Sequence, residues 1–137
     1  MALEIPETSF PRVIVIGGGF GGIQVAKKLR NKEVQVLVLD QHNYHTFQPL
    51  LYQVATGGLE PDSIAYPIRK ILKDFPNFYF RMAVVEEIDT DKNKVKTNIG
   101  NLKFDYLVIC YQRYIDTLAG RNLLLKLLVA DNSYLYL

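Results

Sequence analysis

The sequence predicts an α/β fold in which a parallel sheet carries a small inserted β-meander. Val13-Ile14-Val15-Ile16 is a short β-branched run that ends in glycines, and it predicts a buried strand of a parallel sheet because both of its faces are apolar. A helical spacing of Ile23, Ala26 and Leu29 follows, and a second apolar run covers residues 34–40. Strand, helix and strand together predict a βαβ unit of about 30 residues.

The elements beyond this unit are expected in a definite order. After an irregular stretch, Pro61 suits the first turn of a helix that Pro67 must kink or restart. Apolar residues spaced along that helix are Ile64, Ile68, Ile71 and Leu72. A third strand is expected at residues 78–80, two more at 83–89 and 94–99 joined by the turn 90–93, and an apolar strand at 104–110 after a turn at Gly100-Asn101.

Composition restricts the function classes. The 137 residues are enough for one domain with a core, and 49% hydrophobic with 22% charged residues is typical of globular proteins. The net charge is +2 and the 16 basic residues are scattered, which argues against nucleic-acid binding. The densest basic stretch, residues 92–96, alternates like an exposed strand edge.

Cysteine use and hydropathy indicate the compartment. Cys110 is the only cysteine, which rules out an internal disulfide and fits a reducing cytosol. Residues 1–10 lack the pattern of a signal peptide, and the longest apolar runs fall far short of the roughly 20 residues of a membrane span. We therefore expect a cytoplasmic protein.

The central motif is a glycine-rich turn, Gly17-Gly18-Gly19-Phe20-Gly21-Gly22, which satisfies G-x-G-x-x-G. It follows a predicted strand and opens a predicted helix, the context that a dinucleotide site requires. Gly17 permits the tight turn, Gly19 lets the backbone approach a pyrophosphate, and Gly22 allows close helix packing. The helix N-terminus offers N–H groups and a partial positive charge to phosphates.

An acidic residue stands where this kind of site needs one. Asp40 ends the second predicted strand, 18 residues after Gly22, against an expected separation of about 20. Its carboxylate can accept the ribose hydroxyls of an adenosine and would repel a 2′-phosphate, which disfavours NADP. The alternative is a strand-capping Asp beside an ordinary glycine turn. NAD and FAD stay open at this point, because both contain the same ADP portion.

The residues that follow resemble one family. Residues 42–59, HNYHTFQPLLYQVATGGL, are similar to the segment after the second strand of type II NADH:quinone oxidoreductases, the single-chain NADH dehydrogenases that do not pump protons. Residues 64–69 and 104–109 continue the resemblance, which is nearly continuous from Arg12 to Ile109. It implies a Rossmann-like FAD-binding half-module from an enzyme that takes hydride from NADH onto FAD and passes electrons to quinone.

The resemblance also implies roles for individual residues. Gly17, Gly19 and Gly22 match the FAD pyrophosphate loop, and Asp40 matches the ribose-binding acid. Thr46 and Gln48 fall where the family approaches the flavin and its ribityl chain, and Val85 matches the position whose backbone pairs with adenine. The candidate cofactor site comprises Gly17, Gly18, Gly19, Phe20, Gly21, Gly22, Asp40, Gln41, Thr46, Gln48 and Val85.

No catalytic residue and no metal ligand is assigned. His42 and His45 have no nearby cluster of carboxylates, so we interpret them as loop residues that support the flavin. Tyr44, Phe47 and Tyr52 are more typical of core packing than of flavin stacking. Flavin-linked disulfide reductases use paired cysteines on a helix, whereas Cys110 stands alone at a strand end.

The chain departs from the family after Ile109. The family has Ala-Thr-Gly there, where this chain has Cys110-Tyr111-Gln112. A shifted reading frame near residue 110 is one hypothesis for residues 111–137, an atypical tail expected to be non-native or disordered. Exposure of its Leu-rich run, residues 123–129, would promote self-association. We therefore divide the chain into an incomplete Rossmann-like domain, 1–110, and the tail, 111–137.

Three functions are compatible with these residues. The first is the FAD-binding portion of a type II NADH dehydrogenase, inactive by itself because no second G-x-G-x-x-G for NADH occurs and the quinone pocket and membrane anchor of the family are missing. The second is a non-catalytic module that binds ADP, NAD or FAD. The third is a fragment of a related quinone-linked flavoprotein such as a sulfide:quinone reductase, disfavoured by the missing cysteines.

Overall fold

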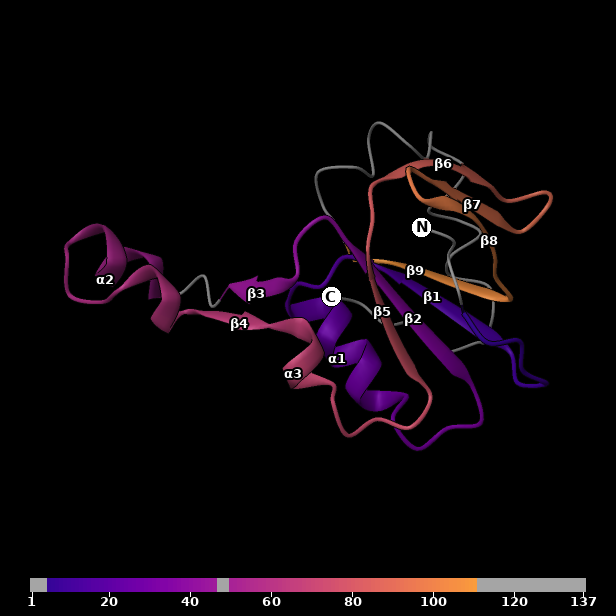
Figure 1. Ribbon diagram of the computed structural model, residues 1–137, viewed down its shortest axis with the longest axis horizontal. Coiled ribbons are helices and arrows are strands. Elements are labelled where there is room, and N and C mark those ends of the chain that lie inside the picture. Colours follow the sequence, from indigo (N-terminus) through magenta and orange to yellow (C-terminus); the bar gives the residue numbers. More distant parts are fainter. Residues whose placement is uncertain (1–4, 47–49, 111–137) are drawn as a thin grey trace.

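A four-stranded parallel sheet forms the centre of the fold. The computed structural model describes residues 5–46 and 50–110 (Figure 1). The sheet has the order β5-β2-β1-β9, with β1 at Arg12–Ile16, β2 at Gln35–Asp40, β5 at Phe78–Met82 and β9 at Tyr106–Ile109. All three pairings are parallel, so the predicted α/β fold with a parallel sheet is confirmed.

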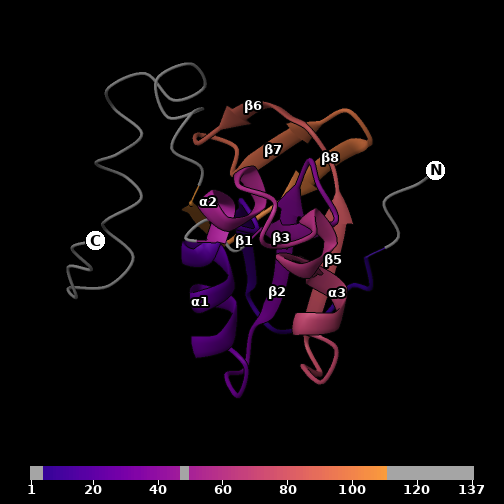
Figure 2. The same ribbon diagram turned by 90° about the vertical axis from the view of Figure 1, so that its left-hand side faces the viewer.

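Both faces of the sheet are covered, which explains why β1 and β2 are apolar throughout. Ile14 and Leu37 on one face pack with Val95 and Leu102, whereas Val15 and neighbouring residues on the other face pack with the helices. Helices α1 and α3 lie on one side of the sheet and strands β6 to β8 on the other (Figure 1), and Figure 2 shows the two helices in front of the sheet. Side chains alternate between the faces of a strand, so two covered faces require apolar residues at every position.

The βαβ unit forms as the sequence predicts. Helix α1, Phe20–Lys28, begins within the glycine turn and packs through Ile23 and Ala26. Lys27 and Lys28 are exposed in its last turn, where cations are favourable next to the negative end of the helix dipole. The helix ends with Leu29 as the C-cap.

The helix expected from Pro61, with a kink or restart at Pro67, is wrong before Pro67, whereas its restart after Pro67 is confirmed. The structure has the 3-10 turn η2 at Pro61–Ser63, strand β4 at Ala65–Pro67 and helix α3 at Ile68–Ile71. A residue that precedes proline is pushed towards extended backbone, so Tyr66 favours a strand. Strand β4 pairs antiparallel with β3, Tyr44–Thr46, and helix α2, Leu51–Ala55, lies between them in the sequence. Pro67 then serves as the N-cap of α3.

The inserted β-meander has three strands where two were expected. These are β6 at Val85–Asp89, β7 at Lys94–Thr97 and β8 at Gly100–Lys103. The turn expected at Gly100-Asn101 lies at residues 98–99, and Gly100, with φ of 139°, begins β8. Positive φ at this position favours glycine, so the residue that indicated a turn is used at its exit.

The strand-edge interpretation of the basic stretch is also wrong. Lys94 and Lys96 are exposed while Val95 between them is fully buried, so the alternation itself is confirmed. Strand β7 lies between β6 and β8, however, and the lysines occupy the open face of the meander. One of them, Lys96, places its Nζ 3.9 Å from a carboxylate oxygen of Glu86.

Residues 111–137 lie outside the described residues, and so do the expected tail and its Leu-rich run. Strand β9 is shorter than the expected 104–110, and the backbone N–H groups of Phe104 and Asp105 donate to the carbonyls of Asn93 and Arg12 before it begins. Within residues 5–46 and 50–110, no helix has the length and apolar character needed to cross a membrane.

Leu37 tests the importance of the central sheet. Leu37 is 0% exposed in β2, so Leu37→Ala should lower the free energy of unfolding by about 2–5 kcal/mol through lost burial and a residual cavity. Leu51, 47% exposed in α2, provides a matched control whose change to alanine should stay within about 0.5 kcal/mol. Urea unfolding followed by circular dichroism measures both, and equal effects would contradict the proposed core.

Candidate dinucleotide site

The candidate site lies at the carboxyl ends of the central strands. The chain leaves β1 into the glycine turn, with β2 on one side of β1 and β9 on the other. The strand order therefore reverses at β1, with earlier strands β2 and β5 on one side and the last described strand β9 on the other, and open α/β sheets bind their ligands at such a switch point. Asp40 ends β2, and the residue after β9, Cys110, donates its N–H to the Ile16 carbonyl at 2.8 Å.

Two glycines of the motif are required by the fold itself. Gly17 has φ of 103°, a region that favours glycine, and its N–H donates to the Leu39 carbonyl at 2.8 Å. A Cβ on Gly22 would lie 1.8 Å from the Gly17 carbonyl oxygen. Real Cβ atoms do not approach a backbone oxygen so closely, so α1 can cross the end of β1 here only with glycine at position 22.

Gly18 is held by contacts from three segments. Its N–H donates to Oδ2 of Asp40 at 2.5 Å, and its carbonyl lies 3.2 Å from Nδ1 of His45. A Cβ at this position would lie 2.5 Å from Cδ1 of the fully buried Ile68. The motif itself leaves position 18 open, so the proximity of α3 explains why a glycine also stands between Gly17 and Gly19.

Gly19 is different, because a Cβ there would meet no described atom within 4 Å. It is the N-cap of α1 with extended backbone, φ of −74° and ψ of −168°, so the fold would accept another residue. No side chain caps this helix and its first turn contains no acidic residue. The N-terminus of α1 therefore presents N–H groups and a positive dipole end towards open space, as a phosphate site requires.

Asp40 joins the turn to two neighbouring segments. Besides the bond to Gly18, its Oδ1 accepts the N–H of His42 at 2.8 Å and its main-chain carbonyl accepts the N–H of Ala83 at 2.8 Å. An ionised carboxylate has about four acceptor positions, so two remain beyond these bonds. The half-buried Asp40 thus has capacity for ribose hydroxyls, and Gln41 follows it, also half-buried.

Val85 presents its backbone to the outer edge of the meander. The N–H of Asn98 donates to the Val84 carbonyl at 3.0 Å, which makes Val85 and Thr97 a pair of the non-hydrogen-bonded kind. The N–H and C=O of such a residue point away from the partner strand, and among the described strands β6 pairs on one side only. The Val85 side chain is buried, so its backbone is the part that a ligand could reach.

Of the other expected site residues, Phe20, Gly21 and Thr46 are described by the structure and Gln48 is not. Phe20, 45% exposed, begins α1, and Gly21 lies beside Cys110, whose Sγ would be 3.6 Å from a Cβ at position 21. Thr46 ends β3, next to His45 in sequence, and Gln48 lies outside the described residues. Of the expected site residues, the structure thus brings Asp40 into contact with the glycine turn 17–22.

Sequence reasoning missed the contribution of two residues to this site. His45 was expected to support the flavin, and the structure places it against the glycine turn; no sequence signal indicated Ile68. Across the described part of the chain, no group of three or more His, Cys, Asp or Glu side chains could hold a metal ion.

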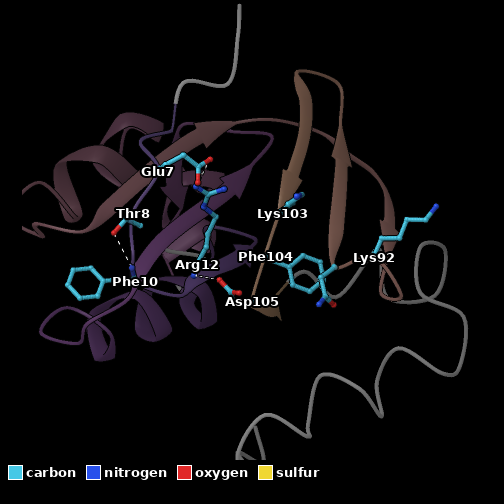
Figure 3. A pocket seen from close by; sticks show the side chains of 9 residues that line it. Glu7, Thr8, Phe10, Arg12, Lys92, Lys103, Phe104 and Asp105 are labelled. Atoms are coloured by element: carbon cyan, nitrogen blue, oxygen red, sulfur yellow. Dashed lines mark hydrogen bonds and ion pairs between the residues drawn. The ribbon is translucent and has the colours of Figure 1, made fainter.

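A hollow of about 390 Å³ lies at the opposite, amino-terminal end of β1 (Figure 3). At its wall, Arg12 donates from Nε to Gln35 Oε1 at 2.6 Å and from its backbone N–H to Asp105 Oδ2 at 2.7 Å. The Arg12 guanidinium also lies 3.8 Å from the Glu7 carboxylate. These groups bind one another, and the hollow contributes no residue to the candidate site.

The sequence of residues 11–111 matches the family described as pyridine nucleotide-disulphide oxidoreductase. The chain belongs to this family. Its members typically bind FAD and NAD(P)H, so dinucleotide binding is the general function that the family implies for the glycine turn.

The chain is also similar to curated type II NADH:quinone oxidoreductases. Ndh of Mycobacterium tuberculosis is 44% identical over 78 residues, which cover 57% of this chain and 17% of that protein. The Staphylococcus aureus enzyme is 34% identical over 103 residues, covering 72% of this chain and 25% of the relative. The chain thus spans a quarter or less of these curated relatives.

Similar solved structures agree with this fold. The sulfide:quinone oxidoreductase of Aquifex aeolicus is 36% identical with a TM-score of 0.67, covering 72% of this chain and 24% of that one. NDH2 of Plasmodium falciparum, solved with NADH, has a TM-score of 0.66 at 22% identity and covers 78% of this chain and 25% of that one. The second likeness concerns the fold alone.

The two kinds of glycine in the turn can be separated by mutation. Gly22→Ala should lower the free energy of unfolding by at least about 2 kcal/mol, because its Cβ would overlap the Gly17 carbonyl. Gly19→Ala should cost about 1 kcal/mol or less, the weaker N-cap being its main penalty. Thermal unfolding compares the variants, and similar losses would contradict the assignment of Gly19 to a ligand.

Cys110 should react slowly at neutral pH. Burial raises the pKa of its thiol above the ordinary value of 9.0, because the thiolate loses solvation. A raised pKa leaves less of the reactive thiolate at every pH below it, so alkylation by iodoacetamide should be slower than in the urea-unfolded chain. The alkylation rate should also rise with pH, and the pH at its midpoint should be higher in the folded chain than in the unfolded chain. Equal midpoints in folded and unfolded chains would contradict the burial of the thiol.

Proposed function

We propose that the chain is the FAD-binding portion of a type II NADH:quinone oxidoreductase. The observation that carries this proposal is the open space at Gly19, in a turn whose other required glycines are explained by contacts within the chain. A glycine that the fold does not need, at the N-cap of a helix without a side-chain cap, fits a site reserved for phosphate. Similarity to the M. tuberculosis and S. aureus enzymes supports the choice of family member.

Different residues of the site would contact different parts of FAD. The turn at Gly17–Gly22 would hold the pyrophosphate through backbone N–H groups at the start of α1. Asp40 would accept the ribose hydroxyls with its remaining lone pairs, and the Val85 backbone would face the adenine. Gln41, Thr46 and Gln48 complete the proposed site, the last two towards the flavin.

Bound FAD would supply the redox chemistry, as acceptor of hydride from NADH and donor of electrons to quinone. Hydride transfer requires the nicotinamide to be held against the flavin ring. The 137-residue sequence contains one G-x-G-x-x-G turn, which the proposal assigns to FAD. We therefore propose that this chain alone binds the cofactor without oxidising NADH.

A related quinone-linked flavoprotein is the second candidate. The likeness to the A. aeolicus sulfide:quinone oxidoreductase, at 36% identity over 72% of this chain, favours it. The nucleotide sequence beyond codon 110 distinguishes the two if all three frames are read. A second glycine-rich turn after a strand supports the NADH enzyme, and cysteines without such a turn support the sulfide enzyme.

Cofactor binding by the purified chain tests the leading proposal. Titration with FAD, followed by flavin fluorescence anisotropy, should saturate at one FAD per chain. Asp40→Asn should weaken binding by about tenfold or more, because it removes charge-assisted bonds to the ribose and loosens Gly18. Asp91→Asn, in the distant turn before β7, should leave affinity unchanged. No saturable FAD binding, or NADH-driven quinone reduction by this chain alone, would contradict the proposal.

A further inference from the structure

His45 is attached to the glycine turn at two points. Its Nδ1 lies 3.2 Å from the Gly18 carbonyl oxygen, and its ring packs edge-to-face on Phe20 with centroids 4.7 Å apart. Gly18 and Phe20 are the neighbours of Gly19 on either side. The histidine, half-buried in β3, therefore contacts both neighbours of Gly19, the glycine at which a Cβ would meet no described atom within 4 Å.

The contact with Gly18 determines where the proton of the imidazole must be. A carbonyl oxygen only accepts hydrogen bonds, so Nδ1 must carry the hydrogen. In the neutral ring the other nitrogen, Nε2, is then an acceptor. The structure thus assigns the Nδ1–H form to His45.

The geometry of the peptide bond extends this contact to Gly19. The Gly18 carbonyl and the Gly19 N–H belong to one planar trans unit, in which they point in opposite directions. A hydrogen bond that draws the carbonyl towards His45 therefore aims the Gly19 N–H away from it. Asp40 acts in the same way on the preceding peptide, because its carboxylate binds the Gly18 N–H.

We propose that His45 is a positioning residue of the phosphate-binding turn: its Nδ1–H holds the Gly18 carbonyl and so aims the Gly19 N–H at the pyrophosphate. The proposal rests on the proposed function of the turn and names a residue through which it works. It predicts that loss of the Nδ1–H lowers the affinity for ligands that contain a pyrophosphate and leaves the affinity for ligands that lack one unchanged.

Three variants of the full chain test this proposal. His45→Phe keeps a ring against Phe20 and removes the donor, whereas His45→Asn offers an amide N–H at the position of Nδ1. His42→Phe is the matched control, because the His42 ring is exposed and stacks on Tyr44, and its bond to Asp40 comes from the backbone. Dissociation constants for ADP and for adenosine are measured by NMR chemical-shift titration.

His45→Phe should raise the dissociation constant for ADP by about 3- to 10-fold, the effect of one lost hydrogen bond. Adenosine should be unaffected, and His45→Asn and His42→Phe should bind ADP within about twofold of the unmodified chain. Unchanged ADP binding by His45→Phe would overturn the proposal. An equal loss of ADP and adenosine would do the same, since it indicates a general structural role.

The imidazole itself provides a readout that needs no ligand. Long-range ¹H–¹⁵N spectra of the chain should show the hydrogen of His45 on Nδ1, and His45→Phe should shift the Gly19 amide signal while His42→Phe does not. A hydrogen on Nε2 alone would overturn the proposal. If the unmodified chain binds neither FAD nor ADP, the proposed function fails, and the spectra still decide whether His45 holds the turn. The same spectra decide the matter if His45→Phe does not fold.

Discussion

The close approach of α1 to the end of β1 is the constraint on which this structure depends. A Cβ at position 22 would lie 1.8 Å from the Gly17 carbonyl oxygen, and Gly17 itself has φ of 103°, so the helix can leave the strand in this way only with glycine at both positions. Once the helix is fixed, its N-terminus opens beside Gly19, and α3 and β3 can lie close enough for Ile68 and His45 to contact Gly18. The packing of one face of the sheet and the geometry of the candidate site thus follow from the same turn.

Sequence reasoning succeeded where the signal is local. The apolar runs of β1 and β2, the glycines between them and Asp40 at a strand end each carry information within a few residues, and the family match over residues 11–111 agrees with it. Sequence reasoning failed for strands that form only because they pair with a segment elsewhere in the chain. Strand β4 is extended because Tyr66 precedes proline and pairs with His45, and β8 forms because Val95 and Leu102 share a buried face.

The candidate site shows the same division. Gly17, Gly19 and Gly22 could be assigned physical tasks in advance, because the motif has a known relation to strand and helix. The reason for Gly18 could not, since it depends on Ile68, 50 positions further along the chain and buried in α3. His45 could be recognised as a loop residue near the cofactor, but its hydrogen bond to Gly18 requires β3 to return to the turn, and that placement depends on pairing with β4.

Asp40 links the stability of the apoprotein to the proposed ligand. Its carboxylate already accepts two backbone N–H groups, from Gly18 and His42, so its negative charge is stabilised before any ribose arrives. Those bonds also fix the carboxylate in place, and a group that is already oriented loses little entropy when it accepts further hydrogen bonds. A strand-capping role and a ribose-binding role are therefore compatible interpretations of Asp40, because the capping contacts hold the side chain where the ligand would need it.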